Sequence, residues 1–115
     1  MLVTAIIISC QKNDFPKLTG PYLGLKPPGM TPELFAPGII STNMNAAKIA
    51  ISPDGKEIFF RLMAYDHSFM TLVSMREKNG VWSKPEVAPF SGRWNDGEPF
   101  FHWTEQGFFL HQTGL

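Results

Sequence analysis

The chain has 115 residues, which is enough for one small domain. Ten basic and ten acidic side chains cancel, so the charge balance indicates neither a nucleic acid nor an anionic surface as a partner. A single cysteine excludes an intrachain disulfide, a cysteine zinc cluster and a Cys-X-X-Cys redox pair, and no apolar run approaches the roughly 20 residues of a membrane span. Ten prolines, ten glycines and ten phenylalanines favour many turns and predict an all-β fold.

Residues 1–10 are interpreted as a lipoprotein-type signal that ends at Cys10. An uncharged apolar run at 2–8 leads into Ile7-Ile8-Ser9-Cys10, which resembles the bacterial lipobox. The resemblance implies cleavage before Cys10 and a lipidated cysteine whose acyl chains hold the protein to a membrane. Signal peptides run to about 15–30 residues with a basic start, so we expect the true start codon upstream of Met1. A buried strand that ends in a buried cysteine is the alternative.

Residues 11–44 form a proline- and glycine-rich lead-in. Six prolines between Phe15 and Gly38 exclude a regular helix and a central strand. The composition predicts an extended segment that spaces the lipid anchor from a folded domain, with a P-x-x-P ligand for an aromatic groove as the alternative. The apolar residues expected to anchor it are Tyr22, Leu23, Leu25, Met30, Leu34 and Phe35.

Residues 45–89 begin with a predicted β-hairpin. Its strands, at 46–51 and 56–63, are joined by the tight turn Ser52, Pro53, Asp54 and Gly55. In such a turn the proline presets φ, the aspartate bonds the backbone ahead of it and the glycine accepts a positive φ. The pattern therefore predicts strand, turn, strand.

A third strand at 69–76 and a fourth strand complete the predicted sheet. Asn79-Gly80 is a strong two-residue hairpin signal, and the fourth strand is expected to begin at Val81 and to end at Pro85. The inner strands carry unbroken apolar triplets, Ile49-Ala50-Ile51 and Ile58-Phe59-Phe60. Such runs predict strands that are covered on both faces, as in a propeller blade packed between its neighbours.

Residues 90–115 are predicted to be an inter-blade loop followed by an incomplete second blade. Ala50-Ile51 is matched by Phe100-Phe101, and residues 58–60 are matched by 108–110, at a constant offset of 50 positions. A repeat of this period with strand-turn-strand content is typical of a β-propeller.

A family resemblance rests on these motifs. I-A-I-S-P-D-G-K-E-I-F-F, followed by M-T-L-V-S-M-R-E-K-N-G-V-W-S-K-P-E, resembles the S-P-D-G blade repeat of TolB-like, WD-repeat-like β-propellers. The preceding G-P-Y-L-G-L-K-P-P-G-M-T-P-E-L-F-A-P-G is similar to the lead-in of bacterial envelope lipoproteins of this group. The resemblance spans about residues 20–101 and implies a four-stranded blade plus the start of a second one.

The tail after Phe101 departs from the expected repeat, because His102-Trp103-Thr104-Glu105 stands where a second S-P-D-G turn is expected. Read one base earlier, permitted codons for residues 102–115 encode S-L-D-G-T-R-L-F-F-A-S-N-R-P, which restores S-x-D-G at the 50-residue offset. We hypothesise a frameshift after Phe101 and a truncated product, with a divergent second blade as the alternative. The nucleotide sequence tests this, since codons incompatible with that string exclude the frameshift. One and a half blades leave an open sheet, whose edges we expect to be exposed.

Few polar residues of the chain form a pattern typical of catalysis or of metal binding. The three histidines (His67, His102 and His111) have no metal-type spacing, and we expect neither a metal nor a cofactor. Asp66-His67-Ser68 contains the residue types of a hydrolase triad, but neighbours in sequence do not face one another as a triad requires, so an inter-strand loop is expected. The best binding candidates are the loop residues Arg93, Trp94, Asn95 and Asp96.

The resemblance therefore implies a non-enzymatic binding or scaffolding module of a lipid-anchored propeller in the bacterial cell envelope, facing the periplasm or the cell surface. The implied partners are the membrane, through Cys10, and an envelope protein or glycan. The alternative is the accessory propeller of a peptidase or glycan-processing enzyme. Downstream codons in the shifted frame separate the two, since a G-x-S-x-G motif after the last blade favours the peptidase.

Overall fold

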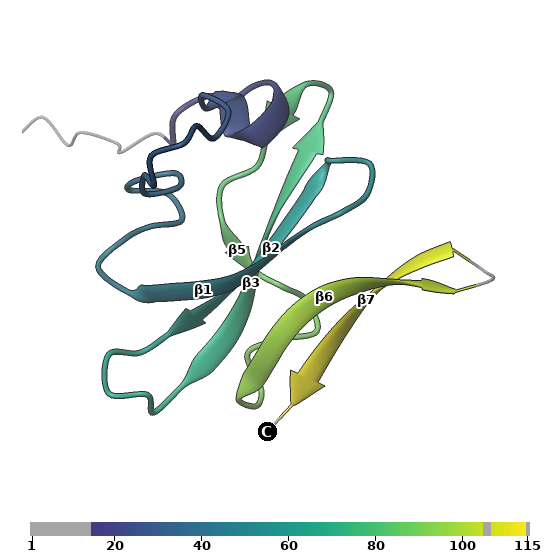
Figure 1. Cartoon of the computed structure of the whole chain (residues 1–115). Helices are drawn as coiled ribbons and strands as arrows, with labels where there is room; N and C mark the ends of the chain where they lie inside the picture. Colours follow the sequence, from purple (N-terminus) through teal and green to yellow (C-terminus); the bar gives the residue numbers. More distant parts are fainter. Residues whose placement is uncertain (1–14, 105–106, 115) are drawn as a thin grey trace, which may run out of the picture.

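The computed structural model describes residues 15–104 and 107–114, so Cys10 and the rest of the predicted signal lie outside the described residues. The described chain contains one four-residue 3-10 turn, η1 (Pro21–Gly24), and is otherwise strands and loops, which confirms the predicted all-β fold class (Figure 1). The strands are β1 (Asn45–Ile51), β2 (Glu57–Met63), β3 (Met70–Lys78), β4 (Val81–Trp82), β5 (Glu86–Val87), β6 (Asp96–Thr104) and β7 (Gly107–Gly114).

Strands β1 to β4 form an antiparallel meander in the order β1-β2-β3-β4, and β5 also pairs with β3. The fourth strand, β4, ends at Trp82, before Pro85, and the separate short strand β5 follows the proline, with Val87 opposite Val73. Ser83 maintains contact across the interruption. Its amide donates to the Arg76 carbonyl over 2.8 Å, and its Oγ accepts a bond from the Arg76 amide over 3.0 Å.

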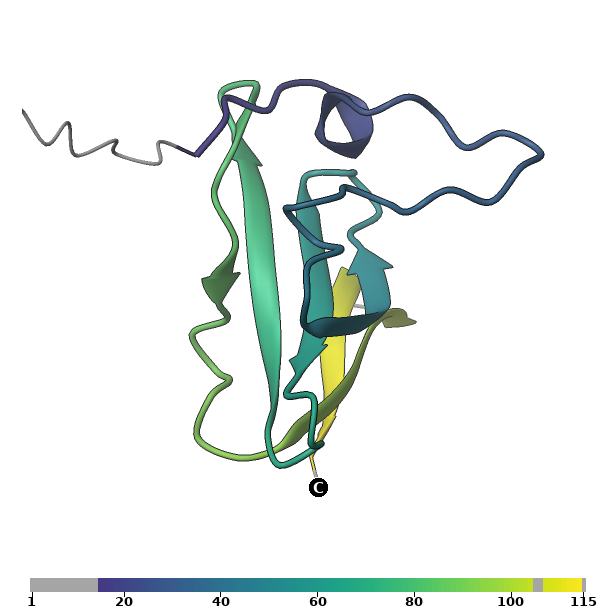
Figure 2. The ribbon, with the colours of Figure 1, turned by 90° about the vertical axis from the view of Figure 1, so that its left-hand side faces the viewer.

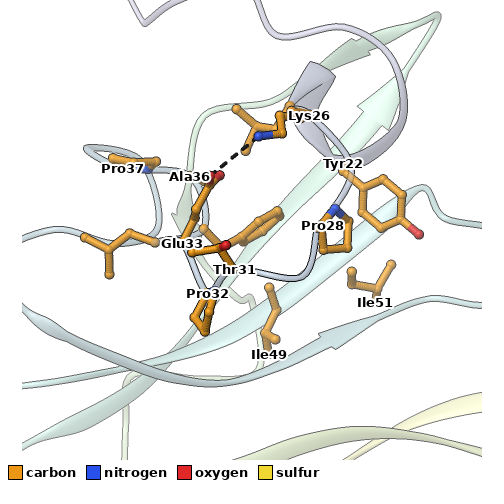
Figure 3. A pocket seen from close by; sticks show the side chains of 14 residues that line it. Tyr22, Lys26, Pro28, Thr31, Pro32, Glu33, Ala36, Pro37, Ile49 and Ile51 are labelled. Atoms are coloured by element: carbon orange, nitrogen blue, oxygen red, sulfur yellow. Dashed lines mark hydrogen bonds and ion pairs between the residues drawn. The ribbon is translucent and has the colours of Figure 1, made fainter.

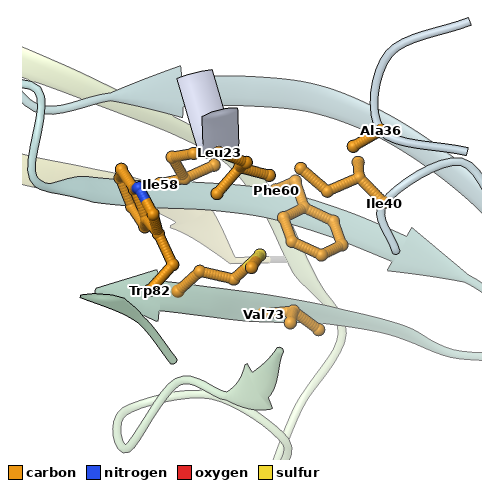
Figure 4. Close-up of a cluster of buried hydrophobic side chains, with 8 residues drawn as sticks. Leu23, Ala36, Ile40, Ile58, Phe60, Val73 and Trp82 are labelled. Carbon is orange, nitrogen blue, oxygen red and sulfur yellow. The ribbon is translucent and has the colours of Figure 1, made fainter. Parts of the chain in front are cut away.

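Strand β2 is buried on both faces, as its unbroken apolar run predicts. The same prediction for Ile49-Ala50-Ile51 is wrong, because β1 is the edge strand, contains no buried residue and leaves Ile49 and Ile51 exposed. Ile58 and Phe60 point to one side of the sheet, called here the first face, and Phe59 points to the other, the second face. Figure 4 shows the cluster on the first face, which consists of Leu23, Ala36, Ile40, Ile58, Phe60, Val73, Met75 and Trp82. The cluster on the second face consists of Phe59, Leu72 and Ala88, with Phe101 packed against it.

The N-terminal segment supplies three of the eight residues in the first-face cluster: Leu23, Ala36 and Ile40. It lies across that face instead of leading away from it (Figure 2). Of the six apolar anchors expected from the sequence, Leu23 is buried and Leu25 and Phe35 are partly buried against the cluster, whereas Tyr22, Met30 and Leu34 are exposed. Prolines prevent ladder pairing but not side-chain packing, so the segment covers the sheet without joining it as a regular strand.

Trp82 ties this segment to the sheet. Its backbone amide donates to the Leu18 carbonyl and its indole Nε1 donates to the Gly20 carbonyl, each over 2.9 Å. Thr19 forms an isolated bridge with Val81, so the segment also covers the outer edge of β4. The chain then turns back through Gly24 at φ 74°, where a Cβ atom would lie only 2.4 Å from the Thr19 carbonyl oxygen.

The β6–β7 hairpin packs against the second face of the sheet and contacts β1, β2 and β3. The Phe101 ring meets the Phe59 ring edge-on with centroids 5.9 Å apart, and the Phe90 ring lies 6.0 Å from Phe59. This hairpin turns later than the first one. Ile51 pairs with Ile58, whereas β6 runs on to Thr104, which pairs with Gly107. The missing S-P-D-G sequence explains the difference, and the frameshift stays a prediction.

The first sheet is open, with β1 as an exposed edge strand, and both of its edges carry features that limit pairing with another strand. On the outer side, Thr19 bridges Val81. On the inner side, β1 carries an irregularity between Ala47 and Ala50, with Lys48 at φ 54°. A bulge and a lysine on an edge strand are two of the devices that oppose pairing with another strand.

Candidate binding site

An apolar groove lies between β1 and the loop of residues 25–37 (Figure 3). Its volume is about 560 Å³. Most of the side chains that line it are aliphatic, aromatic or proline, as is usual for pockets that take apolar ligands. The main apolar lining residues are Tyr22, Leu25, Pro28, Leu34, Phe35 and Ile51.

The loop holds its shape through hydrogen bonds at its base and an ion pair near its tip. The Ala36 carbonyl accepts bonds from the amides of Ile39 and Ile40, and the Ser41 hydroxyl donates to the Phe35 carbonyl over 2.7 Å. Nearer the tip, Lys26 Nζ lies 3.5 Å from Glu33 Oε1 (Figure 3). Both side chains are largely exposed, so the pair orients the loop more than it stabilises the protein.

The floor of the groove comes from β1. Ile49 and Ile51 project from this strand toward the loop (Figure 3) and remain 45% and 38% exposed. Lys26 and Glu33 are the two charged side chains in the lining, and they neutralise each other. The groove is therefore suited to an uncharged, apolar partner. Sequence reasoning missed it, because nothing in the sequence indicates that residues 25–37 fold back over β1.

The predicted ligand-binding residues Arg93, Trp94, Asn95 and Asp96 do not converge on one site. Asn95 Oδ1 accepts a bond from the Met70 amide over 3.1 Å, and Asp96 is only 4% exposed. Asp96 accepts bonds from the Ser91 hydroxyl and, over 3.2 Å, from the Gly92 amide. These two residues hold the loop between the sheets. Arg93 and Trp94 point outward, with Trp94 75% exposed.

The turn Ser52-Pro53-Asp54-Gly55 is organised by its serine more than the sequence suggests. Ser52 is buried, and its Oγ accepts bonds from the amides of Lys56 over 3.2 Å and Glu57 over 2.9 Å. Its hydroxyl donates to Asp54 Oδ1, which also accepts the Lys56 amide over 3.0 Å. Gly55 takes φ 71°, and its amide donates to the Ser52 carbonyl. All four residues therefore shape the backbone of the turn.

These bonds make the turn sensitive to acid. Hydrogen bonds from the Ser52 hydroxyl and, with a smaller effect, from the Lys56 amide hold the pKa of Asp54 below its ordinary value of 3.8. A lowered folded-state pKa contributes stability above pH 3.8, and that contribution is lost as the pH falls through the folded value. We therefore expect Asp54→Asn to lose less stability than the parent between about pH 4 and pH 2 in urea titrations.

Asp66 provides a matched comparison for this pH dependence. The Ser68 hydroxyl and amide lower its pKa in the same way, in a separate turn. Asp66→Asn should remove its own share of the acid sensitivity and leave that of Asp54, and the two effects should add in the double variant. An Asp54→Asn protein as acid-sensitive as the parent contradicts the role of this carboxylate.

The Asp66-His67-Ser68 segment forms an exposed turn between β2 and β3, as expected. Ser68 donates to Asp66 Oδ1 from its hydroxyl over 2.6 Å and from its amide over 3.0 Å, and the His67 amide donates to the Ala64 carbonyl over 2.9 Å. The carboxylate oxygen is thus engaged by serine in a local turn, and the three side chains do not form a relay.

Two further findings concern the part of the chain that the structure describes. Within residues 15–104 and 107–114, no three His, Cys, Asp or Glu side chains gather in a way that would hold a metal ion. Over the same residues, no helix has the length and apolar character to cross a bilayer. No family model, curated protein or solved structure matches this chain.

Proposed function

We propose that this chain is a non-catalytic binding module, the first blade and part of the second blade of a TolB-like β-propeller lipoprotein in the bacterial cell envelope. The observation that carries the binding role is the neutral apolar groove over β1. Its walls come from a hydrogen-bonded loop and a paired strand, so it is held open without a ligand. Because the groove is already formed, less conformational entropy of its loop and side chains is lost when a ligand binds.

Two features support the propeller assignment. In the first sheet, β1 to β4 form an antiparallel meander whose two central strands, β2 and β3, are buried on both faces. The following hairpin then stacks on one of those faces through Phe101 and Phe59, as successive blades do. The S-P-D-G turn and the placing of Phe101 50 residues after Ile51 also support the assignment, although β7 pairs with β6 in a different register, with Phe101 opposite Leu110.

The envelope location is supported by the lipobox-like sequence around Cys10 and by the position of the first described residue. Phe15 packs against the first-face cluster, and four residues, 11–14, separate it from Cys10 in the sequence. The five Cα–Cα steps from Cys10 to Phe15 span at most about 17 Å when fully extended. A lipid on Cys10 would therefore hold the sheet close to the membrane surface, where an envelope partner can reach the groove.

A photo-crosslinking amino acid at Ile49 tests the binding role in bacterial cells that express the protein with its upstream codons. We expect a discrete crosslinked species from this position. Val87 is the matched control, since it is an exposed aliphatic strand residue that does not line the groove. Equal labelling from both positions, or none from Ile49, contradicts a binding role for the groove.

The same cells test the anchor by fractionation. The parent chain is expected in the membrane fraction, and Cys10→Ala is expected in the soluble fraction, because acylation supplies about 0.8 kcal/mol for each methylene buried in the bilayer. Membrane association that is unchanged in Cys10→Ala contradicts lipidation. Either outcome leaves the crosslinking result at Ile49 interpretable, since the groove lies in the folded part of the chain.

A further inference from the structure

The tip of the loop of residues 25–37 carries the most exposed large apolar side chain of the described chain. Met30 is 102% exposed, and Leu34, further along the same loop, is 76% exposed. The tip itself, residues 27–32, reads Pro-Pro-Gly-Met-Thr-Pro and has no charged side chain. Lys26 and Glu33, which flank it, pair with each other. The tip is therefore an uncharged, protruding apolar surface, and Figure 2 shows the loop extending away from the sheet.

The backbone of this tip also has few hydrogen-bond donors. Three of its six residues are prolines, which lack an N–H group. A loop that enters the boundary between lipid headgroups and acyl chains loses water from its N–H groups, and each one left unpaired costs free energy. The prolines reduce that cost. Because the tip is not helical, a shallow position in the interface is the limit of its insertion.

The loop and the start of the described chain lie at the same end of the sheet (Figure 2). Thr19 bridges Val81 beside the β3–β4 turn, and the first hairpin turn is at this end too, since the Glu77 amide donates to the Lys56 carbonyl over 2.8 Å. Cys10 lies at most about 17 Å from Phe15 along the chain. A lipid on Cys10 therefore brings this end of the sheet, with the loop, to the membrane surface.

The charges at this end do not oppose contact with a membrane. Lys17, Lys56 and Lys78 are exposed here, and the acidic side chains outside ion pairs are Asp54 and Glu77. Asp54 accepts bonds inside the first turn, and Glu77 accepts a bond from the Gly80 amide. The end therefore has a small positive excess, which suits the anionic lipids of a membrane surface.

We propose that residues 27–32 enter the membrane interface beside the lipid anchor, so that the bilayer surface is a second contact of this chain. Met30 supplies a flexible apolar side chain at the tip. Tyr22, which lies beside the loop and is 49% exposed, suits the headgroup level, because its ring is apolar and its hydroxyl is polar. The proposal rests on the anchor at Cys10 proposed above. It adds an orientation, because two separate contacts fix how the module stands on the membrane.

Depth-resolved fluorescence of the lipidated chain tests this contact. The protein is expressed with its upstream codons and reconstituted into vesicles of phosphatidylethanolamine and phosphatidylglycerol. Met30→Cys and Tyr65→Cys are each labelled with an environment-sensitive nitrobenzoxadiazole probe, since the parent has one cysteine, whose thiol is consumed by lipidation. Tyr65 is the matched control. It is 88% exposed and lies in the β2–β3 turn, at the opposite end of β3 from the loop.

The probe on Met30→Cys should emit further to the blue than the probe on Tyr65→Cys. It should also lose about threefold more of its emission to a nitroxide lipid labelled near the headgroup, because an interfacial group lies about 5–10 Å into the boundary. The probe on Tyr65→Cys should be quenched by iodide from the water. Circular dichroism of both variants checks that the β-fold is kept.

The failures of this proposal and of the anchor give different results. Equal quenching of the two probes by iodide overturns insertion of the loop and leaves the anchor and the groove intact. A blue shift of the Met30→Cys probe without quenching by the nitroxide lipid shows a protein cover and also overturns it. The parent chain, treated with the same thiol reagent, should stay unlabelled. Labelling of the parent means that Cys10 is free, which rejects the anchor and this proposal together.

Discussion

Phe59→Ala is expected to remove about 3–5 kcal/mol from the free energy of unfolding. The Phe59 ring is buried on the second face and contacts the rings of Phe90 and Phe101, so its removal opens a cavity between the sheet and the β6–β7 hairpin. The whole free energy of unfolding of a small domain is only about 5–15 kcal/mol, so this loss would be a large part of it. Urea unfolding followed by tryptophan fluorescence measures the loss.

Phe69→Ala is the matched control for this change. Phe69 lies just before β3 and is 43% exposed, and its truncation should cost less than about 1 kcal/mol. If the Phe59 variant is no less stable than the Phe69 variant, the hairpin does not pack on the sheet.

Trp82→Ala is expected to destabilise the protein by a similar amount, about 3–5 kcal/mol, and also to release the N-terminal segment. The Trp82 ring is part of the first-face cluster, and its Nε1 donates to the Gly20 carbonyl. Without the ring, trypsin should cleave after Lys17 much faster, since proteolysis requires local opening of the backbone. Mass spectrometry of the early fragments identifies this site.

Two variants separate packing from hydrogen bonding in this result. Trp82→Phe keeps an aromatic ring but leaves the Gly20 carbonyl without its donor, so a loss of about 1 kcal/mol is expected. Trp94→Ala removes an exposed indole and should change stability by no more than about 0.5 kcal/mol. Unchanged tryptic cleavage in Trp82→Ala would show that the N-terminal segment is held independently of this residue.

The sheet was largely predictable, because its signals are local. Proline, aspartate and glycine in one turn and Asn79-Gly80 in the next predict strands β1 to β4, and the unbroken run Ile58-Phe59-Phe60 predicts the burial of β2 on two faces. The equivalent prediction for β1 fails, because that strand is at the edge of the sheet. Pro85 marks a break in pairing, as predicted, because it lacks an N–H. The short strand β5 beyond it was not predicted, and Val87 there pairs with Val73 of β3.

The candidate site was not predictable, because it depends on contacts between distant parts of the chain. Asp96 looks like an exposed loop carboxylate in the sequence, yet Ser91 and Gly92 bind it in the interior. The groove requires residues 25–37 to fold back over Ile49 and Ile51, and a proline-rich segment carries no periodic pattern from which such a path can be inferred.

By itself, the amino-acid sequence determined the all-β class, the hairpin turns and the demand for cover on both faces of the inner strands, because backbone preference and side-chain alternation act over a few residues. Only the tertiary structure decided what supplies that cover. On one face it is the lead-in anchored by Trp82, and on the other it is the β6–β7 hairpin seated on Phe59. Burial of apolar surface is not directional, so a sequence can require a partner for each face without specifying which segment provides it.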